Sequence, residues 1–142
     1  MICLFVDTNV IIDHLADRKP FSDSAARLFE FVEKGKARIF VSSLSFSHVY
    51  YVVKKVTGHQ ETIQILRELE ALTDTLDVTK LIIKSALGSN YKDFEDAIQY
   101  HTAVSNKKIA AIVTRDPKGY KDSDLAVLSP DEAISLVENQ IR

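Results

Sequence analysis

Five short apolar runs, separated by longer segments with helical spacing, constrain the fold of this chain more than any other feature. The runs cover residues 2–6, 38–41, 75–78, 109–113 and 125–128. A continuous apolar run is typical of a strand that is covered on both faces, as in a parallel sheet. Strands that alternate with helices predict βαβ units with right-handed crossovers. The sequence therefore predicts an α/β fold, with a parallel sheet and helices on both of its faces.

Apolar residues spaced three and four positions apart indicate the helices between these runs. The stripes begin at Ala25, Val49, Ile65 and Phe94. Gly35 and Gly58 follow the first two stripes, and glycine often ends a helix because it tolerates a left-handed backbone. The last helix is predicted to begin within residues 129–132, Ser-Pro-Asp-Glu, which form a capping box with proline at the first helical position.

The composition fits a single domain spanning residues 1–142, of which 46% are hydrophobic and 27% charged. The formal net charge is −2, so the chain has no global basic field, and any contact with nucleic acid must be local. The single cysteine, Cys3, cannot form an internal disulfide and favours a reducing compartment. No apolar run approaches the ~20 residues of a membrane span, and no basic leader precedes the first run. We therefore expect a cytoplasmic protein that does not enter a membrane.

Acidic residues follow the strong apolar runs at the points where the predicted strands end. Asp7 follows the first run, Asp116 closely follows the fourth, and Asp93 and Asp96 lie near the start of the helix that leads into the fourth. Ligands of open α/β sheets bind beyond the carboxyl ends of the strands, so these four side chains can share one edge. Two like charges ~4 Å apart repel by about 1 kcal/mol in water and about 4 kcal/mol at an effective dielectric constant of ~20. Such a cluster needs protons or a cation, and its oxygen donors favour Mg²⁺ or Mn²⁺ over zinc.

Three segments resemble the acidic motifs of the PIN domain, the fold of VapC-type toxin ribonucleases. They are residues 6–10 (VDTNV), 93–99 (DFEDAIQ) and 113–116 (VTRD). The resemblance implies a three-layer α/β/α sandwich with a five-stranded parallel sheet in the order 3-2-1-4-5. It also implies that Asp7, Asp96 and Asp116 are catalytic and, with Asp93, hold Mg²⁺ or Mn²⁺ for the hydrolysis of RNA by a metal-activated water. The implied partners are RNA, a second copy of the chain and a small antitoxin protein.

One position departs from the resemblance. The family usually has a glutamate on the helix after the second strand, where this chain has His48. A neutral imidazole can bind Mn²⁺ but is a poor ligand of Mg²⁺, so hard cations should bind more weakly. A catalytically weak RNA-binding or protein-interaction module is therefore an alternative hypothesis. A receiver-like phosphoryl-transfer domain is a third, but the first motif lacks the second strand-end acid that such a domain needs.

The polar residues around the acids have two interpretations each. Thr8, Asn9, Thr114 and His48 can orient waters and carboxylates, or can make ordinary structural hydrogen bonds. Arg115, Lys118 and Lys121 can contact RNA phosphates beside the cleaved bond, or can lie in a solvated loop. Asp93 and Asp96 also have the spacing of a helix cap, and Asp116 begins a turn-like Asp-Pro-Lys-Gly segment.

Overall fold

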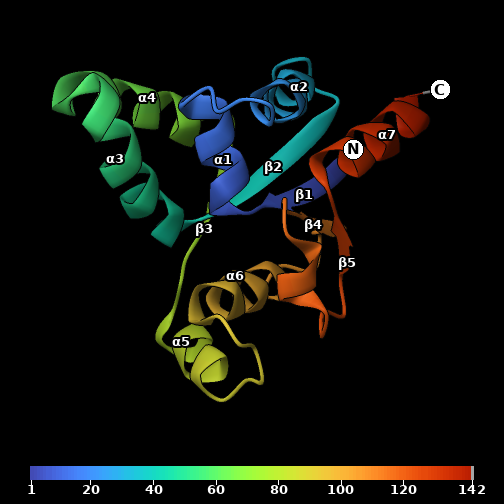
Figure 1. Cartoon of the computed structure of the whole chain (residues 1–142). Coiled ribbons are helices and arrows are strands. Elements are labelled where there is room, and N and C mark those ends of the chain that lie inside the picture. Colours follow the sequence, from blue (N-terminus) through green and yellow to red (C-terminus); the bar gives the residue numbers. More distant parts are fainter. Residues whose placement is uncertain (142) are drawn as a thin grey trace.

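The computed structural model, which describes residues 1–141, contains one five-stranded parallel sheet (Figure 1). The strands are β1 (Ile2–Val6), β2 (Ala37–Ser42), β3 (Asp74–Leu76), β4 (Ala111–Val113) and β5 (Ala126–Leu128). Their order in the sheet is β3-β2-β1-β4-β5, which is the order implied by the resemblance. The central strand β1 pairs with β2 on one side and with β4 on the other. The order reverses between β1 and β4, so the sheet has its topological switch point there.

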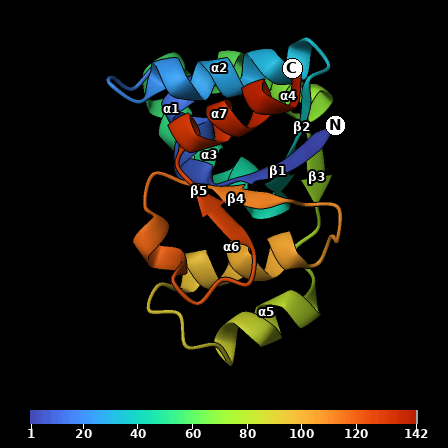
Figure 2. The same cartoon turned by 90° about the vertical axis from the view of Figure 1, so that its right-hand side faces the viewer.

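Helices cover both faces of the sheet, as Figures 1 and 2 show from two directions. One layer contains α1 (Thr8–Leu15), α2 (Ser22–Glu33), α3 (Ser43–Thr57), α4 (His59–Leu72) and α7 (Pro130–Ile141). The other layer contains α5 (Lys80–Leu87) and α6 (Phe94–Val104), and a short 3₁₀ turn, η1 (Pro117–Tyr120), follows β4. The predicted three-layer α/β/α architecture is confirmed. No helix within residues 1–141 has both the length and the apolar character that crossing a bilayer requires.

The alternation of side chains along β1 divides the core between the two faces of the sheet. Leu4 and Val6 belong to the large cluster beneath α1, α2, α3 and α7, whereas Cys3 and Phe5 belong to a smaller cluster with Tyr100 of α6. All five residues of β1 are buried. A strand buried on both faces needs apolar residues at every position, which explains the uninterrupted run in the sequence.

Most of the predicted helix boundaries are confirmed. Gly35 and Gly58 follow α2 and α3 with φ angles of 70° and 83°, a region that favours glycine. The capping box at α7 is formed in both directions: the Glu132 backbone N–H donates to Ser129 Oγ at 3.1 Å, and the Ser129 N–H donates to Glu132 Oε1 at 2.9 Å. These caps fix where the chain enters and leaves the helical layer.

Two short helices were not predicted by the apolar spacing. Helix α1 has eight residues and buries three consecutive apolar side chains, Val10, Ile11 and Ile12, so it lacks the one-sided stripe of a surface helix. Helix α5 also has eight residues, and its large side chains Leu81 and Leu87 are exposed. Both helices depend on their neighbours in the fold rather than on a local pattern.

Candidate active site

Asp7 lies at the switch point, immediately after β1 and at the N-terminal end of α1. Its backbone N–H donates to the carbonyl of Val113 at 2.9 Å, which continues the β1–β4 ladder by one residue. The buried carboxylate accepts a hydrogen bond from Thr114 Oγ1 at 3.0 Å and a longer one from Gln99 Nε2 at 3.4 Å. Burial raises the pKa of Asp7, although both hydrogen bonds act in the opposite direction. The side chain is thus held rigidly, in a place that disfavours its charge.

Asp96 lies in the first turn of α6, and the fold strongly raises the pKa of its carboxyl group. Its pKa is raised to about 7, first by burial and then by the negative charges of Asp7, Asp93, Asp116 and Glu95. These carboxylates come from three distant segments of the chain. The fold therefore brings together the four predicted acids, and adds Glu95, which the sequence analysis did not single out.

Asp93 is the N-cap of α6. Its Oδ1 accepts a hydrogen bond from the backbone N–H of Asp96 at 3.0 Å, and its side chain is exposed. The capping interpretation of Asp93 is therefore confirmed. A role in binding a cation stays a prediction, because one carboxylate can cap the helix with one oxygen and present the other.

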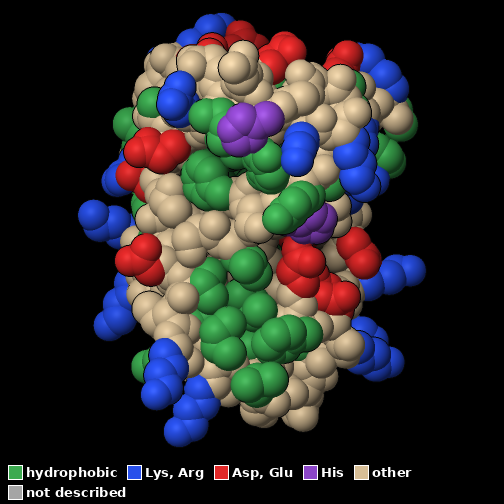
Figure 3. Space-filling view, turned by 90° about the vertical axis from the view of Figure 1, so that its left-hand side faces the viewer, with side chains coloured by type: hydrophobic (Ala, Val, Ile, Leu, Met, Phe, Trp, Pro, Cys, Tyr) green, Lys and Arg blue, Asp and Glu red, His purple; other side chains and the backbone are tan. Residues whose placement is uncertain are grey.

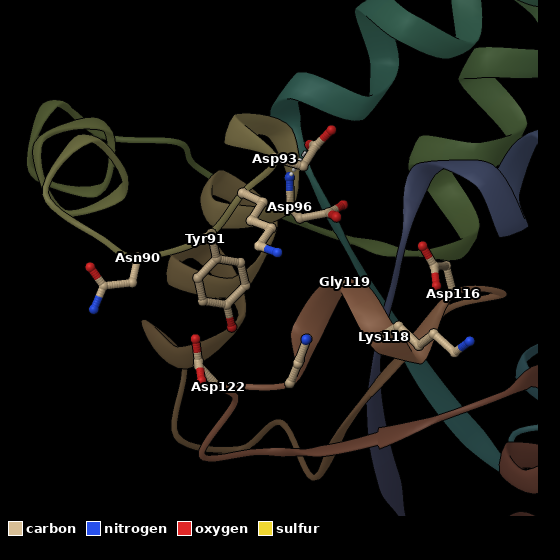
Figure 4. Close-up of a pocket in the computed structure, with 10 residues that line it drawn as sticks. Asn90, Tyr91, Asp93, Asp96, Asp116, Lys118, Gly119 and Asp122 are labelled. Atoms are coloured by element: carbon tan, nitrogen blue, oxygen red, sulfur yellow. Dashed lines mark hydrogen bonds between the residues drawn. The ribbon is translucent and has the colours of Figure 1, made fainter.

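Asp116 directly precedes η1 and lies across the pocket from Asp96 (Figure 4). The backbone N–H of Asp116 donates to Thr114 Oγ1 at 3.1 Å, so one hydroxyl contacts both Asp7 and Asp116. A methyl group at Gly119 would lie 2.6 Å from Asp96 Oδ2 and 3.8 Å from Asp116 Oδ2. Only glycine lets the backbone of η1 approach the carboxylates so closely.

Tyr120, the last residue of η1, is a buried tyrosine that follows Gly119 directly. Its side chain is only 2% exposed, and within the described part of the chain its hydroxyl has no hydrogen-bond partner. Burial raises the pKa of this hydroxyl, and the charges of Asp7 and Asp96 raise it further. The buried Oε1 of Gln99 is also unpartnered among residues 1–141. Buried polar atoms without partners are rare and point to a missing water, ion or ligand.

A pocket of about 470 Å³ opens between the start of α6 and η1 (Figure 4). It is lined by Asn90, Tyr91, Lys92, Asp93, Asp96, Asp116, Lys118, Gly119, Lys121 and Asp122. Two of the three predicted RNA-binding residues, Lys118 and Lys121, therefore lie on its wall. The pocket thus carries both lysines and carboxylates, which suits a ligand that is itself anionic and accompanied by a cation.

The donor set fits Mg²⁺ or Mn²⁺, because Asp7, Asp96 and Asp116 supply carboxylate oxygens that act on one another electrostatically. Within residues 1–141 the buried Tyr120 hydroxyl and Gln99 Oε1 also lack hydrogen-bond partners. The carboxylates are not preassembled, however. Within residues 1–141, no three His, Cys, Asp or Glu side chains are close enough to hold a metal ion as they stand. The predicted cation ligands therefore stay a prediction.

The predicted supporting residues differ in their surroundings. Thr8 is buried, and its hydroxyl is hydrogen-bonded to Ser45 Oγ at 2.7 Å and to Gln99 Nε2 at 3.1 Å. Thr8 and Thr114 thus belong to the network that holds Asp7. Asn9 is exposed, and its backbone carbonyl accepts a hydrogen bond from Arg18 Nη2 at 3.3 Å.

His48 lies on α3 and is 3.1 Å, from Nδ1 to Oε1, from Glu95 of α6. The position at which the resemblance implies a glutamate therefore contacts a glutamate contributed by another helix. Sequence spacing could not reveal this contact, because α3 and α6 belong to different helical layers and the two residues are 47 positions apart in the chain.

Arg115 is anchored rather than free. Its Nε lies 2.7 Å from Oδ2 of Asp13, a buried carboxylate that also accepts a hydrogen bond from Arg18 Nε at 2.9 Å. The guanidinium carbon of Arg115 is 3.9 Å from the centre of the Phe21 ring. This side chain therefore ties the segment after β4 to α1, and any contact with RNA would use the remaining guanidinium nitrogens.

The sheet order and the acidic pocket define a class of α/β protein that binds its ligand at the carboxyl ends of β1 and β4. The family model of the PIN domain matches residues 4–118 of this chain. The chain belongs to the PIN domain family.

Individual relatives are more distant. Ribonuclease VapC1 of Aquifex aeolicus (strain VF5) is 24% identical over 134 residues, which span 91% of this chain and 91% of that protein. A chain of a toxin-antitoxin complex from Klebsiella pneumoniae has a TM-score of 0.66 and 22% identity, and the match covers 89% of this chain and 97% of that one. VapC20 of Mycobacterium tuberculosis, a sarcin-ricin loop cleaving toxin, has a TM-score of 0.60 and 18% identity over 77% and 86% of the two chains.

Proposed function

We propose that this protein is a metal-dependent endoribonuclease of the toxin type. The observation that carries the proposal is the convergence of Asp7, Asp96 and Asp116, from three distant segments, on one edge of the sheet beside a pocket lined by lysines. The names of two relatives support the substrate class, since VapC1 is a ribonuclease and VapC20 is a sarcin-ricin loop cleaving toxin.

The chain's own residues would bind and orient the RNA. Lys118 and Lys121 line the pocket, and we expect them to contact phosphates beside the cleaved bond, which would fix the register of the strand without reading its bases. Thr114 and Gln99 hold Asp7 in one orientation. The phosphodiester to be cleaved would thereby be positioned over the carboxylates. Such positioning of the reacting groups accounts for much of the rate acceleration in enzymatic phosphoryl transfer.

Asp7, Asp96 and Asp116 would hold the cation, with Asp93 assisting. When bound there, Mg²⁺ or Mn²⁺ would lower the pKa of a water molecule and neutralise charge on the attacked phosphate. In-line attack of water on phosphorus forms one P–O bond and breaks the bond to the 3′ oxygen, which leaves with a proton. The products are a 3′-hydroxyl and a 5′-phosphate.

A second copy of the chain and an antitoxin are proposed as protein partners. Figure 3 shows hydrophobic side chains gathered on the face that carries α5, next to a group of acidic side chains and a histidine. The exposed apolar side chains of α3 and α5 include Tyr51, Val56, Leu81 and Leu87. Exposed apolar area of this kind suits a protein interface, and the Klebsiella relative was solved as a toxin-antitoxin complex.

The test is cleavage of single-stranded RNA with and without Mg²⁺ or Mn²⁺. The wild-type protein should cleave only with the cation, and Asp7→Asn or Asp96→Asn should abolish cleavage. Glu61→Gln, in the first turn of α4, removes the same charge far from the pocket and serves as the matched control. Cleavage that survives in both aspartate variants, or without any divalent cation, would refute the proposal.

The alternative is a PIN-like module that binds RNA or a protein without cleaving. It is favoured by His48 in place of the implied glutamate, and by the arrangement of the acids, of which no three within residues 1–141 are close enough to hold a metal ion as they stand. Measurable RNA binding with no cleavage in either cation would support this alternative over the nuclease.

A further inference from the structure

Helices α3 and α6 approach each other at the edge of the sheet through one polar contact, between His48 and Glu95. The Nδ1–Oε1 distance is 3.1 Å, and the two side chains are 42% and 46% exposed. A carboxylate can only accept a hydrogen bond, so the histidine donates through a proton on Nδ1. Glu95 Oε1 is thereby occupied, while Oε2 is available to a ligand.

Glu95 is electrostatically part of the acidic pocket, although it lies outside the set of residues that line it. Its negative charge acts on Asp96, on the buried Asp7 and on the Tyr120 hydroxyl. Glu95 immediately precedes Asp96 in the first turn of α6, so their side chains leave the helix about 100° apart. The Asp96 carboxylate lies against Gly119 of η1, whereas the Glu95 carboxylate contacts His48 of α3, so Glu95 lies beside the pocket on the side of α3.

We infer that Glu95 is a further cation-binding acid of this pocket, and that His48 is the positioning residue that holds its carboxylate beside the pocket. The inference rests on the proposed function. A second observation independent of the acids points to a ligand in the same place: the hydroxyl of Tyr120, a side chain only 2% exposed, has no partner among the described residues and lies close enough to Asp7 and Asp96 to feel their charges.

A purely structural role for the pair is a weak explanation of the contact. A half-exposed histidine–carboxylate pair contributes little to stability because water competes for both partners. The contact does restrict a long glutamate side chain, which would otherwise lose rotamer freedom whenever it bound a cation. Holding Glu95 in place before the cation arrives lowers this cost, so His48 should matter for affinity and very little for unfolding.

The decisive measurement is Mn²⁺ affinity of the full chain by calorimetry, with urea unfolding and RNA cleavage measured in parallel. Glu95→Gln should weaken Mn²⁺ binding about 10- to 100-fold, and His48→Ala about 10-fold, which is the range for lost ligand-orienting partners. The midpoint of urea unfolding without Mn²⁺ should stay unchanged in His48→Ala. Glu61→Gln, on α4, is the matched control and should bind Mn²⁺ as the wild type does.

A double variant tests the position of the charge rather than its presence. Because the two side chains are in contact, a carboxylate at position 48 lies next to the place that the Glu95 carboxylate occupies beside the pocket. His48→Glu combined with Glu95→Gln should therefore recover most of the Mn²⁺ affinity that Glu95→Gln loses, with cleavage recovering in parallel. A structural role would predict no such rescue.

The outcomes separate this inference from the proposed function. If the wild type binds Mn²⁺ and cleaves RNA, Asp96→Asn abolishes both, and Glu95→Gln is indistinguishable from the wild type, the inference is wrong and the nuclease proposal stands. If Glu95→Gln is impaired but the double variant is not rescued, the positional argument is overturned. A wild-type protein that neither binds Mn²⁺ nor cleaves RNA overturns both.

Discussion

Replacing Asp96 with asparagine should stabilise the fold at neutral pH while abolishing the proposed activity. The carboxyl of Asp96 has a pKa of about 7 in the folded protein, against 3.8 for an unperturbed aspartate. Ionising such a group in the fold costs about 4 kcal/mol if the whole difference acts on stability, at about 1.4 kcal/mol per tenfold change in proton affinity. Asp96 is partly solvated, so screening reduces the expected effect to about 1–2 kcal/mol.

The pH dependence follows from which state holds the proton. Between pH 3.8 and about 7, the folded chain keeps the Asp96 proton and the unfolded chain has released it. The folded state thus binds more protons, so its stability falls as the pH rises through this window and levels off above it. Asp96→Asn cannot ionise, and this part of the decline should disappear.

Urea unfolding at pH 5 and pH 8, without divalent cations, measures the effect. At pH 8 the Asp96→Asn variant should unfold with a midpoint about 0.5–1 M higher than the wild type, for a slope of about 2 kcal/mol per molar. At pH 5, where the wild type has crossed only the first part of the window between 3.8 and about 7, the difference should be less than half of that at pH 8. Saturating Mn²⁺ should stabilise the wild type and leave the variant unchanged, because a ligand stabilises only the state that binds it.

The control is Glu61→Gln, which should show the wild-type pH profile. An Asp96→Asn variant that is less stable than the wild type at pH 8, or whose stability changes with pH as the wild type's does from pH 5 to 8, would show that burial and the neighbouring charges do not disfavour the ionised Asp96 carboxylate.

Three further substitutions test the packing around the acids. Gly119→Ala should reduce cleavage roughly 100-fold, because the new methyl group displaces the Asp96 carboxylate, while circular dichroism should report an unchanged fold. Thr114→Val should cost about 1–3 kcal/mol in urea unfolding, since it leaves the buried Asp7 without its shorter side-chain hydrogen bond, and NMR titration should find the pKa of Asp7 raised further. Arg115→Gln should lower the midpoint of thermal unfolding, because it removes the ion pair between Arg115 and the buried carboxylate of Asp13. Lys118→Gln and Lys121→Gln should instead raise KM for RNA in a salt-dependent way and leave that midpoint unchanged.

The central strands of the sheet could be predicted because a strand that is buried on both faces requires apolar residues at every position. Strands β1 and β4 need apolar residues at each position, and their ends are marked by Asp7 and by the Thr114–Asp116 segment. Helices α1 and α5 have no comparable pattern in the sequence. Each has only eight residues, and neither shows a repeating apolar stripe long enough to stand out.

The candidate site was predictable to the extent that strand ends determine it. Strand order brings Asp7 and Asp116 to one edge, and the helix that enters β4 adds Asp96. The roles of Gly119 and Glu95 were not predictable, because each depends on how closely two separate elements approach. The first depends on η1 against α6, and the second on α3 against α6.

The position of β1 in the middle of the sheet determines when the pocket can exist during synthesis. The hydrogen bond between Thr114 and Asp7 joins residues that are 107 positions apart in the chain. A nascent polypeptide leaving the ribosome therefore carries its first acid for most of translation with nothing to complete the pocket. Premature termination before β4 would release a fragment unable to assemble the pocket, so any harmful activity would begin only after nearly the whole chain has been made.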